Sequence, residues 1–379
     1  MAVRHHLAAD VKAADVTRVA CDLVGIHATD PASVYLGALA RTKSLTHEDV
    51  ADALYDKRSV LKVLGMRRTM FVEPRELVPV VQAAVTDTLA KAERKRTIQM
   101  LEGAKVADDA EAWMSDVEAQ TVAALDKAGE ATATELTKKV PGLRVQIPVA
   151  VGKKYEGKVG VSTRMLFLLA TEGRIVRGRP RGTWLSSMYA WAPMEKWLGA
   201  PLPVLKTEAA QAELARQYLA AYGPATLRDV QWWAGWTMAT TRKALAAIDA
   251  ESVELEDGNG FVLPGDTRAT SESEPWVALL PTLDTTPMGW VERGWFMGAH
   301  TPRLFDRNGN IGPTVWVNGR VVGGWAQLKS GEVVTRLLED VSAKERKQID
   351  AEADRIGAWL GESRIIPRFR TPLEQELTR

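Results

Sequence analysis

The clearest sequence signal for the fold lies in residues 241–264, TRKALAAIDAESVELEDGNGFVLP. It begins with an apolar helical run and continues as two short extended segments around Asp257-Gly258-Asn259-Gly260, a composition that favours a tight hairpin turn. A short helix that opens at Thr226-Leu227-Arg228-Asp229 precedes it. The order helix, turn, helix and two-stranded hairpin is typical of a winged helix-turn-helix unit.

The same pattern occurs at two earlier places in the chain, residues 59–74 (SVLKVLGMRRTMFVEP) and residues 162–180 (STRMLFLLATEGRIVRGRP). The short helices before them open at Thr46-His47-Glu48-Asp49 and at Thr134-Glu135-Leu136, and the acidic residues after Thr46 fit a capping box. We therefore predict a mainly α fold with some β structure, built from tandem winged helix-turn-helix units plus a mixed α/β C-terminal region.

This repeat predicts four regions along the chain. Residues 1–125 hold the first unit and a spacer helix at about 76–101, residues 126–205 the second unit, residues 206–265 the third, and residues 266–379 the C-terminal region. Residues 198–206 contain two prolines and are predicted to be a linker.

The C-terminal region is predicted to contain strands and one long helix. The strands are expected at 276–281, 312–322 and 332–338, with a hairpin turn at Val317-Asn318-Gly319-Arg320. An amphipathic helix at about 342–360 precedes a last strand at 364–369.

Composition indicates a globular protein without a cofactor or a thiolate metal site. The chain has 379 residues, 46% of them hydrophobic and 26% charged, with a net charge of +1. Its single cysteine excludes an intramolecular disulfide and suits a reducing cytoplasm. Cys21 falls in the apolar pattern of Val16, Val19, Ala20 and Leu23 and is predicted to be buried. The five histidines lack ligand spacing, and no P-loop, Rossmann glycine fingerprint, HExxH or Gly-x-Ser-x-Gly elbow is present, so no metal is expected.

The N-terminus lacks the apolar run of a signal peptide, and no apolar stretch in the sequence is long enough to span a membrane. We therefore expect a cytoplasmic protein without a membrane partner, which associates with the nucleoid when it is bound to DNA.

Arginine is concentrated in residues 173–182, which contain Arg174, Arg177, Arg179 and Arg181 and no acidic residue. A smaller basic pair is Arg67-Arg68. Guanidinium groups in a glycine-rich segment can approach phosphates closely, which predicts a DNA-binding surface. The alternative is a solvated surface hairpin in which arginine serves solubility.

The candidate site is the loop His27-Ala28-Thr29. Two polar side chains at positions i and i+2 of an extended segment point to the same side, where both can contact one water molecule. Asp30-Pro31 then fits a helix start, with Asp30 as N-cap and Pro31 at the first helical position. The alternative is that His27 and Thr29 are ordinary loop residues that satisfy local backbone groups.

Four segments resemble the AlkZ-like family of bacterial DNA glycosylases: residues 25–41 (GIHATDPASVYLGALAR), 67–70, 173–197 and 279–284 (LLPTLD). The resemblance covers nearly the whole chain. It implies three winged-helix units wrapped around DNA and excision of alkylated purines, in some branches of bulky adducts or interstrand crosslinks. The signature of that family is Gln-x-Gln or Gln-x-Asp before Asp-Pro, whereas this chain has His27-Ala28-Thr29.

Alkylation makes a purine a cationic leaving group, so hydrolysis of its glycosidic bond mainly needs a positioned water molecule. We expect His27 to accept a proton from that water and Thr29 to orient it. No lysine nucleophile is indicated, which predicts a monofunctional enzyme that leaves an abasic site. By the resemblance, Asn318 and Arg320 would probe the minor groove, although a plain type I′ turn explains this hairpin as well.

Three classes of function stay open at this point. The first is a DNA glycosylase whose partner is double-stranded DNA with damaged purines. The runner-up is a non-enzymatic winged-helix DNA-binding protein, a regulator whose loop has lost catalysis. The third is a scaffold of winged helices for protein interactions. In each case we expect a monomer, since several winged units in one chain remove the usual need to dimerise.

Overall fold

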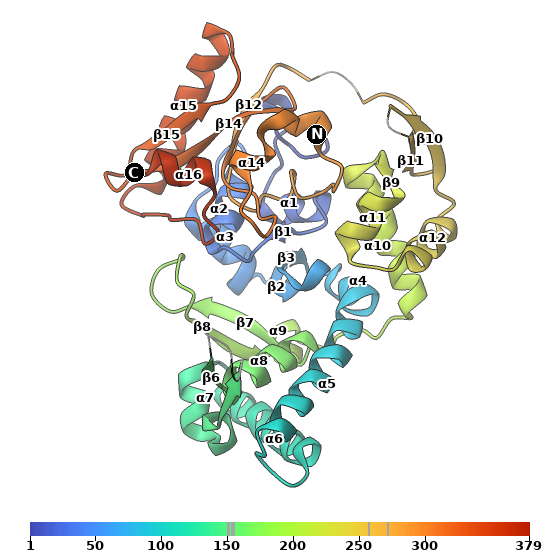
Figure 1. Ribbon diagram of the computed structural model, residues 1–379, viewed down its shortest axis with the longest axis vertical. Coiled ribbons are helices and arrows are strands. Elements are labelled where there is room, and N and C mark those ends of the chain that lie inside the picture. Colours follow the sequence, from blue (N-terminus) through green and yellow to red (C-terminus); the bar gives the residue numbers. More distant parts are fainter. Residues whose placement is uncertain (150–151, 153–155, 257, 271–272) are drawn as a thin grey trace.

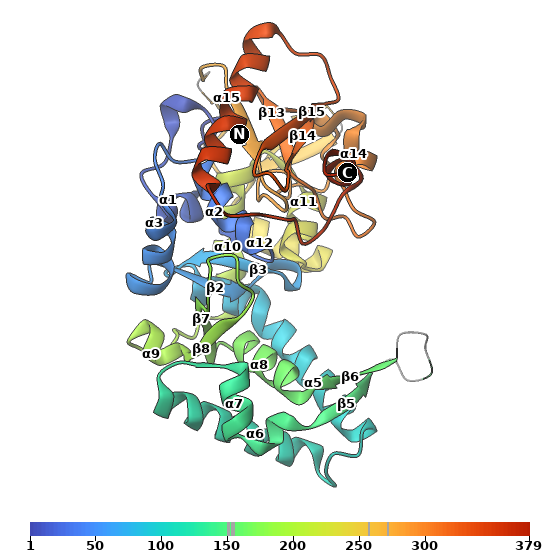
Figure 2. The same cartoon turned by 90° about the vertical axis from the view of Figure 1, so that its left-hand side faces the viewer.

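The computed structural model describes residues 1–149, 152, 156–256, 258–270 and 273–379. Its elements form two lobes in Figure 1, a smaller one below and a larger one above. The larger lobe combines the N-terminal elements, the yellow elements α10 to α12 and the orange to red C-terminal elements. Parts of the chain far apart in sequence therefore lie side by side around the N-terminal sheet (Figure 2).

The first unit belongs to the larger lobe. Its elements are α1 (Val16–Asp22), β1 (Ile26–His27), α2 (Pro31–Leu39), α3 (His47–Ala51), β2 (Val60–Leu64) and β3 (Met70–Pro74). Helix α2 begins as predicted, with Pro31 in its first turn and with the Oδ1 of Asp30 accepting from the backbone N–H of Ala32 at 3.0 Å. The capping box predicted at Thr46 is present and opens α3.

The second unit forms most of the smaller lobe. Its elements are α6 (Ala110–Ala128), β4 (Ala131–Thr132), α7 (Ala133–Lys139), β5 (Gln146–Val149), β6 (Gly157–Gly160), α8 (Val161–Thr171), β7 (Ile175–Pro180) and β8 (Tyr189–Pro193). The N-cap of α7 is Thr132 and not Thr134, because the acidic residue at the third helical position, Glu135, closes its capping box on Thr132. The predicted boundary between residues 125 and 126 falls within α6.

The third unit returns to the larger lobe. Its elements are α10 (Thr207–Tyr222), β9 (Ala225–Thr226), α11 (Leu227–Ala234), α12 (Met238–Ala247), β10 (Glu251–Leu255) and β11 (Gly258–Val262). Thr226 caps α11 together with Asp229, and β10 pairs with β11 in antiparallel register from Glu251 opposite Val262 to Leu255 opposite Gly258. Residue 257 of the predicted turn lies outside the described residues.

The three units share one sheet order. Each contains a short first strand and two longer strands, and the last strand lies between the other two: β1-β3-β2, β4-β8-β7 and β9-β11-β10. All of these pairs are antiparallel. In the second unit the hairpin β5–β6 is inserted between the two helices. The four predicted regions of the chain stay a prediction.

The predicted spacer helix is confirmed, because residues 78–103 are helical without a break. Helix α4 (Val78–Val81), a π-helical turn at Gln82–Thr86 and α5 (Asp87–Gly103) follow one another directly. Helix α9 (Met194–Leu198) ends at Gly199, and residues 201–206 have no regular structure, as predicted for the linker. Among the described residues, no helix is long and apolar enough to cross a membrane.

The C-terminal region contains a four-stranded antiparallel sheet in the order β12-β13-β14-β15. Its elements are β12 (Val277–Leu280), α13 (Gly294–Met297), α14 (Thr301–Leu304), β13 (Thr314–Val317), β14 (Arg320–Gln327), β15 (Val333–Leu337), α15 (Ala343–Leu360) and α16 (Pro372–Leu377). The three predicted strand regions and the long helix are confirmed. The predicted turn is also present, since Val317 pairs with Arg320, and Asn318 and Gly319 have positive φ.

Four predictions of local structure are wrong. Residues 60–64, expected to lie in an apolar helical run, form strand β2, and residues 258–260, expected to lie in a turn, belong to β11. Residues 364–369 form no strand, because side chains satisfy their backbone N–H groups: Ile365 donates to the Oε1 of Gln327 and Arg368 to the Oδ2 of Asp30. Cys21 is exposed. Helix α1 buries the face that carries Val16, Val19 and Ala20, and the next residue points about 100° away from that face.

The hydrophobic cores explain why the units do not separate into independent bodies. One cluster extends from Phe71 of β3 through the third unit to Trp316 of β13. A second joins Ile26 of β1 to Ile349 of α15. The smaller lobe has its own core, and a small cluster beneath β2 and β7 connects the two lobes. The loop of His27 therefore lies on a sheet that is packed from both sides.

Candidate functional site

His27 ends the short strand β1, opposite Phe71 of β3, and its loop leads into α2. The side chain is buried, at 3% exposure, and its ring packs against that of Phe71 at 5.1 Å between centroids. Burial, with a smaller contribution from the charge of Arg67, lowers the pKa of His27 to about 3. The imidazole is therefore neutral at physiological pH.

Thr29 contacts both His27 and β3. Its backbone N–H points to the Nδ1 of His27 at 3.5 Å, and its hydroxyl oxygen accepts from the backbone N–H of Met70 at 3.4 Å. Both distances are at the long limit for hydrogen bonds, and the Thr29 hydroxyl keeps its own proton to donate. Within the part of the chain that the structure describes, the Nε2 of His27 has no hydrogen-bond partner. The Nε2 of His27 and the hydroxyl proton of Thr29 are therefore not used in hydrogen bonds to the loop's own backbone.

The C-terminal region supports this loop from behind. The hydroxyl of Thr285 accepts a hydrogen bond from the backbone N–H of His27 at 3.1 Å, and the hydroxyl of Ser33 donates to the carbonyl oxygen of Thr282 at 2.6 Å. These contacts fix the position of β1 and the first turn of α2 relative to the residues that follow β12. Sequence reasoning did not assign these roles.

A buried ion pair holds the same two segments together. The guanidinium of Arg41 binds the carboxylate of Asp284 through two contacts, at 2.7 and 2.9 Å, and both side chains are almost fully buried. Arg41 and Asp284 are the last residues of two of the segments on which the family resemblance rests. The family resemblance singled out the segment 279–284, but the sequence did not show that Asp284 pairs with Arg41.

The turn between β2 and β3 carries Arg67 and Arg68 to the edge of this site. Both residues have positive φ, 52° and 62°, which is uncommon for side chains other than glycine, asparagine and aspartate. The guanidinium of Arg67 stacks on Trp232 of the third unit at 3.8 Å, and its buried Nε has no partner in the part of the chain that the structure describes. Burial and, secondarily, Arg293 lower the pKa of Arg67 to about 10.

Arg68 points toward the smaller lobe. It pairs with Glu93 at 2.8 Å and lies over the ring of Phe167 at 5.0 Å. Nearby, burial and the charge of Arg96 lower the pKa of Arg164, whose Nε is also buried without a partner among the described residues. Arg67 and Arg164 therefore each keep one guanidinium nitrogen that no described residue binds.

The arginine run predicted at 173–182 is divided by the structure. Arg177, on β7, packs against Tyr189 at 4.6 Å and Trp191 at 5.6 Å, and burial lowers its pKa. The Nε of Arg177 is buried, and no residue within the described ranges binds it. Arg181 follows β7 and is exposed.

The other two arginines of the run are bound by carboxylates. Arg174 contacts the Oε2 of Glu118 at 2.9 Å, and Arg179 contacts both carboxylate oxygens of Asp56 at 2.8 Å. Strand β7, which carries Arg177, packs against β2, whereas Arg174 precedes the first residue of β7. Their assignment to DNA binding stays a prediction.

The predicted hairpin residues have internal roles. The side-chain oxygen of Asn318 accepts from the backbone N–H of Trp276 at 2.8 Å, and Arg320 donates to Glu339 at 2.7 Å. Neither contact tests whether this hairpin also reaches a DNA groove, so that role stays a prediction.

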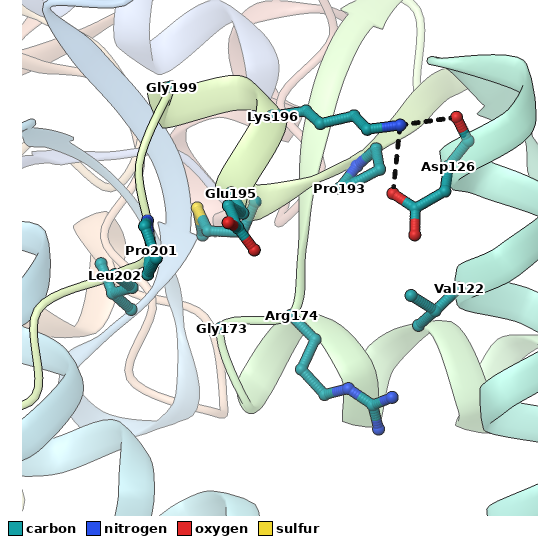
Figure 3. Close-up of a pocket in the computed structure, with 11 residues that line it drawn as sticks. Val122, Asp126, Gly173, Arg174, Pro193, Glu195, Lys196, Gly199, Pro201 and Leu202 are labelled. Atoms are coloured by element: carbon teal, nitrogen blue, oxygen red, sulfur yellow. Dashed lines mark hydrogen bonds and ion pairs between the residues drawn. The ribbon is translucent and has the colours of Figure 1, made fainter.

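A cavity of about 890 Å³ lies elsewhere (Figure 3). It is open to one side of the smaller lobe, between the end of α6, α9 and the linker, and Lys196 closes part of it by binding Asp126. Arg174 is the one predicted site residue that lines it. Because none of the residues of the His27 loop reaches it, we do not assign the chemistry to this cavity. No cluster of three or more metal-ligating residues occurs in the described ranges.

Comparison with known proteins identifies the family. The chain matches the family described as DNA glycosylase AlkZ-like over residues 21–359. The structure of the Streptomyces sahachiroi DNA glycosylase AlkZ is similar, with a TM-score of 0.72 and 19% identity over 96% of this chain and 95% of that one. A search of curated proteins found no match. The matched range includes the His27 loop, the strained turn and the buried Arg41–Asp284 pair, and it confirms the predicted resemblance: the chain belongs to the AlkZ-like family of DNA glycosylases.

Proposed function

We propose that this protein is a monofunctional DNA glycosylase that hydrolyses the N-glycosidic bond of alkylated or bulky-adduct purines in double-stranded DNA. The observation that carries the proposal is a neutral, buried imidazole beside a threonine hydroxyl, on the loop that enters α2. The protein acts as a monomer and needs no cofactor or metal.

The residues divide the chemistry between them. The Nε2 of His27 accepts a proton from the attacking water, and the Thr29 hydroxyl orients that water. In the tautomer that can accept this proton, the imidazole carries its own hydrogen on Nδ1. Forming that tautomer removes only the 3.5 Å hydrogen bond from the backbone N–H of Thr29 to Nδ1. A weak base suffices, because a cationic purine leaves readily and the sugar becomes strongly electrophilic as the bond breaks.

We further propose that the three repeated units are tandem winged-helix units that hold the duplex. Their shared element and sheet order supports this proposal. Arg67, Arg68, Arg177 and Arg181 supply phosphate contacts near the loop. The remaining contacts of the proposed DNA interface are Arg174, Arg179, Asn318 and Arg320.

The basic region between the lobes favours DNA over a protein partner. Arg67, Arg164 and Arg177 each keep a buried Nε without a partner among the described residues, although burial of an unpaired charged group is unfavourable. An external anion bound by these guanidinium groups would offset the unfavourable free energy of their burial. The phosphates of a DNA backbone are regularly spaced anions of this kind. A non-enzymatic regulator would use the same surface, so binding alone does not separate the two readings.

The experiment is release of free base from duplexes that carry N7-alkylguanine lesions of increasing size. We expect release from at least one lesion and an intact abasic strand that breaks only on alkali treatment, as for a monofunctional enzyme. The matched undamaged duplex should release nothing. Strand scission without alkali would contradict the monofunctional mechanism. DNA binding without release from any lesion would favour the regulator.

A further inference from the structure

Lys62 lies where the two lobes meet. It is on β2, opposite Val72 of β3, and β2 faces β7 of the smaller lobe. Two small cavities adjoin its side chain, and Arg177 lines both of them together with Lys62. One extends toward Tyr35 and Tyr55, and the other toward Met70. The two cations therefore line the same two small cavities.

No carboxylate neutralises this pair. Lys62 is partly exposed, and its ammonium makes no hydrogen bond or ion pair with any residue in the described ranges, whereas the Nε of Arg177 is fully buried and has no partner there. Asp30 is near, but its two oxygens already accept from the backbone N–H groups of Ala32 and Arg368. Burial and the charges of Arg177 and Arg368 lower the pKa of Lys62 to about 8, and the charge of Asp30 only partly offsets them.

The size of the cavities limits what can enter. They have volumes of about 20 and 10 Å³, which is room for a group about the size of one water molecule. A whole nucleotide does not fit, whereas one non-bridging oxygen of a phosphodiester does. Such an oxygen carries the negative charge that Lys62 and Arg177 lack, and both side chains are common phosphate ligands in proteins.

This space also adjoins the His27 loop. Met70 lines the second cavity, and its backbone N–H donates to the hydroxyl of Thr29. Arg368 contacts the backbone oxygen of Thr29 at 3.4 Å from the other side. An anion held here would therefore fix the strand close to the residues that orient the water.

We propose that Lys62 and Arg177 form an anion subsite that takes one oxygen of a DNA phosphodiester beside the lesion and so positions the strand over Thr29. The subsite rests on the proposed function, because DNA is its ligand, but it does not depend on base release. Lys62 is a positioning residue in this account, and it takes no part in covalent chemistry.

The test measures binding of the full chain to a fluorescein-labelled, undamaged duplex by anisotropy over a series of salt concentrations. Lys62→Met should weaken binding about tenfold, the size expected for one charge-assisted hydrogen bond. It should also reduce the slope of log affinity against log salt by about one, since one phosphate contact is lost. Lys62→Arg should keep the slope. Lys344→Met, an equal change of charge at an exposed position on α15, should leave both quantities unchanged.

Two further arms separate the sources of an effect. Inorganic phosphate, added at constant ionic strength, should compete with DNA for the wild type more than for Lys62→Met. Borohydride with an abasic duplex should give no covalent adduct with the wild type. A trapped adduct that Lys62→Met abolishes would overturn the ionic role, because the amine would then form a Schiff base.

The results distinguish this subsite from the proposed activity. An unchanged affinity and slope in Lys62→Met would overturn the subsite even if the wild type releases damaged bases. A reduced slope in a protein that releases no base would support the subsite and remove the glycosylase proposal. Failure of the wild type to bind DNA would overturn both.

Discussion

Replacement of His27 by glutamine should remove an acid-dependent loss of stability. In the folded protein the pKa of His27 is lowered to about 3, mainly by burial and less by Arg67, whereas in the unfolded chain it is about 6.5. Between these two values the unfolded chain binds a proton that the folded protein does not. Stability must therefore fall as the pH drops below about 6.5.

The magnitude follows from these two pKa values. At about pH 5, protonation of His27 in the unfolded chain lowers the free energy of that state by about 2 kcal/mol, and at about pH 7 by about 0.2 kcal/mol. The folded protein gains almost nothing at either pH. His27 therefore accounts for about 2 kcal/mol of lost stability over this interval.

The assay is urea unfolding of the wild type and His27→Gln at both pH values. Between about pH 7 and about pH 5, the free energy of unfolding of the wild type should fall by about 2 kcal/mol more than that of the variant. Other buried groups do not disturb this comparison, because His5, whose pKa burial also lowers, and Glu73, whose pKa burial raises, are present in both proteins. Thr29→Val is the matched control, since it alters the same loop without a titratable group and should shift stability equally at both values. Equal acid sensitivity of the wild type and His27→Gln would refute the buried, neutral imidazole.

Three further predictions follow from the geometry. Arg41→Met should lower the free energy of unfolding by about 3–5 kcal/mol, because it leaves the buried carboxylate of Asp284 without its ion pair; denaturation by urea measures this, and a loss under about 1 kcal/mol would argue against the pair's structural role. Glu73→Met should stabilise the protein by about 1–3 kcal/mol, since both carboxyl oxygens of Glu73 are buried without partners among the residues that the structure describes, and a lower melting temperature would contradict this. Arg177→Met should reduce the salt slope of DNA binding by about one, and Arg179→Met, whose guanidinium is already held by Asp56, should reduce it less; the reverse order would move the interface toward Arg179.

Local sequence signals predicted the elements that local physics decides. Asp30-Pro31 begins α2, Thr46 caps α3, and Asn318-Gly319 forms the turn of a hairpin, because each signal acts within a few residues. The failures at Cys21 and at residues 364–369 have the same origin. An apolar pattern indicates which face of a helix is buried but not how wide that face is, and an extended segment becomes a strand only if a partner strand is available.

The site depends mainly on contacts between distant residues, which no local pattern encodes. Thr285, which accepts a hydrogen bond from the backbone of His27, is 258 positions away in the sequence. Arg41 and its partner Asp284 are 243 positions apart. The sequence of β2 does not distinguish Lys62 from an ordinary surface lysine. Only the packing of β2 against the smaller lobe places it beside Arg177 at the two small cavities. The loop residues could be chosen from the sequence because the spacing of two polar groups is itself local.

Single-turnover base release tests the central claim most directly. The wild type, His27→Ala and Thr29→Val would be compared on the alkylated duplex that the wild type processes fastest, at matched saturation of the DNA. We expect His27→Ala to lower the rate constant by about 10²-fold or more, as for loss of a general base, while Thr29→Val lowers it less and both variants still bind DNA. An unchanged rate constant in His27→Ala, with wild-type binding, would contradict the assignment of the water-activating group to this loop.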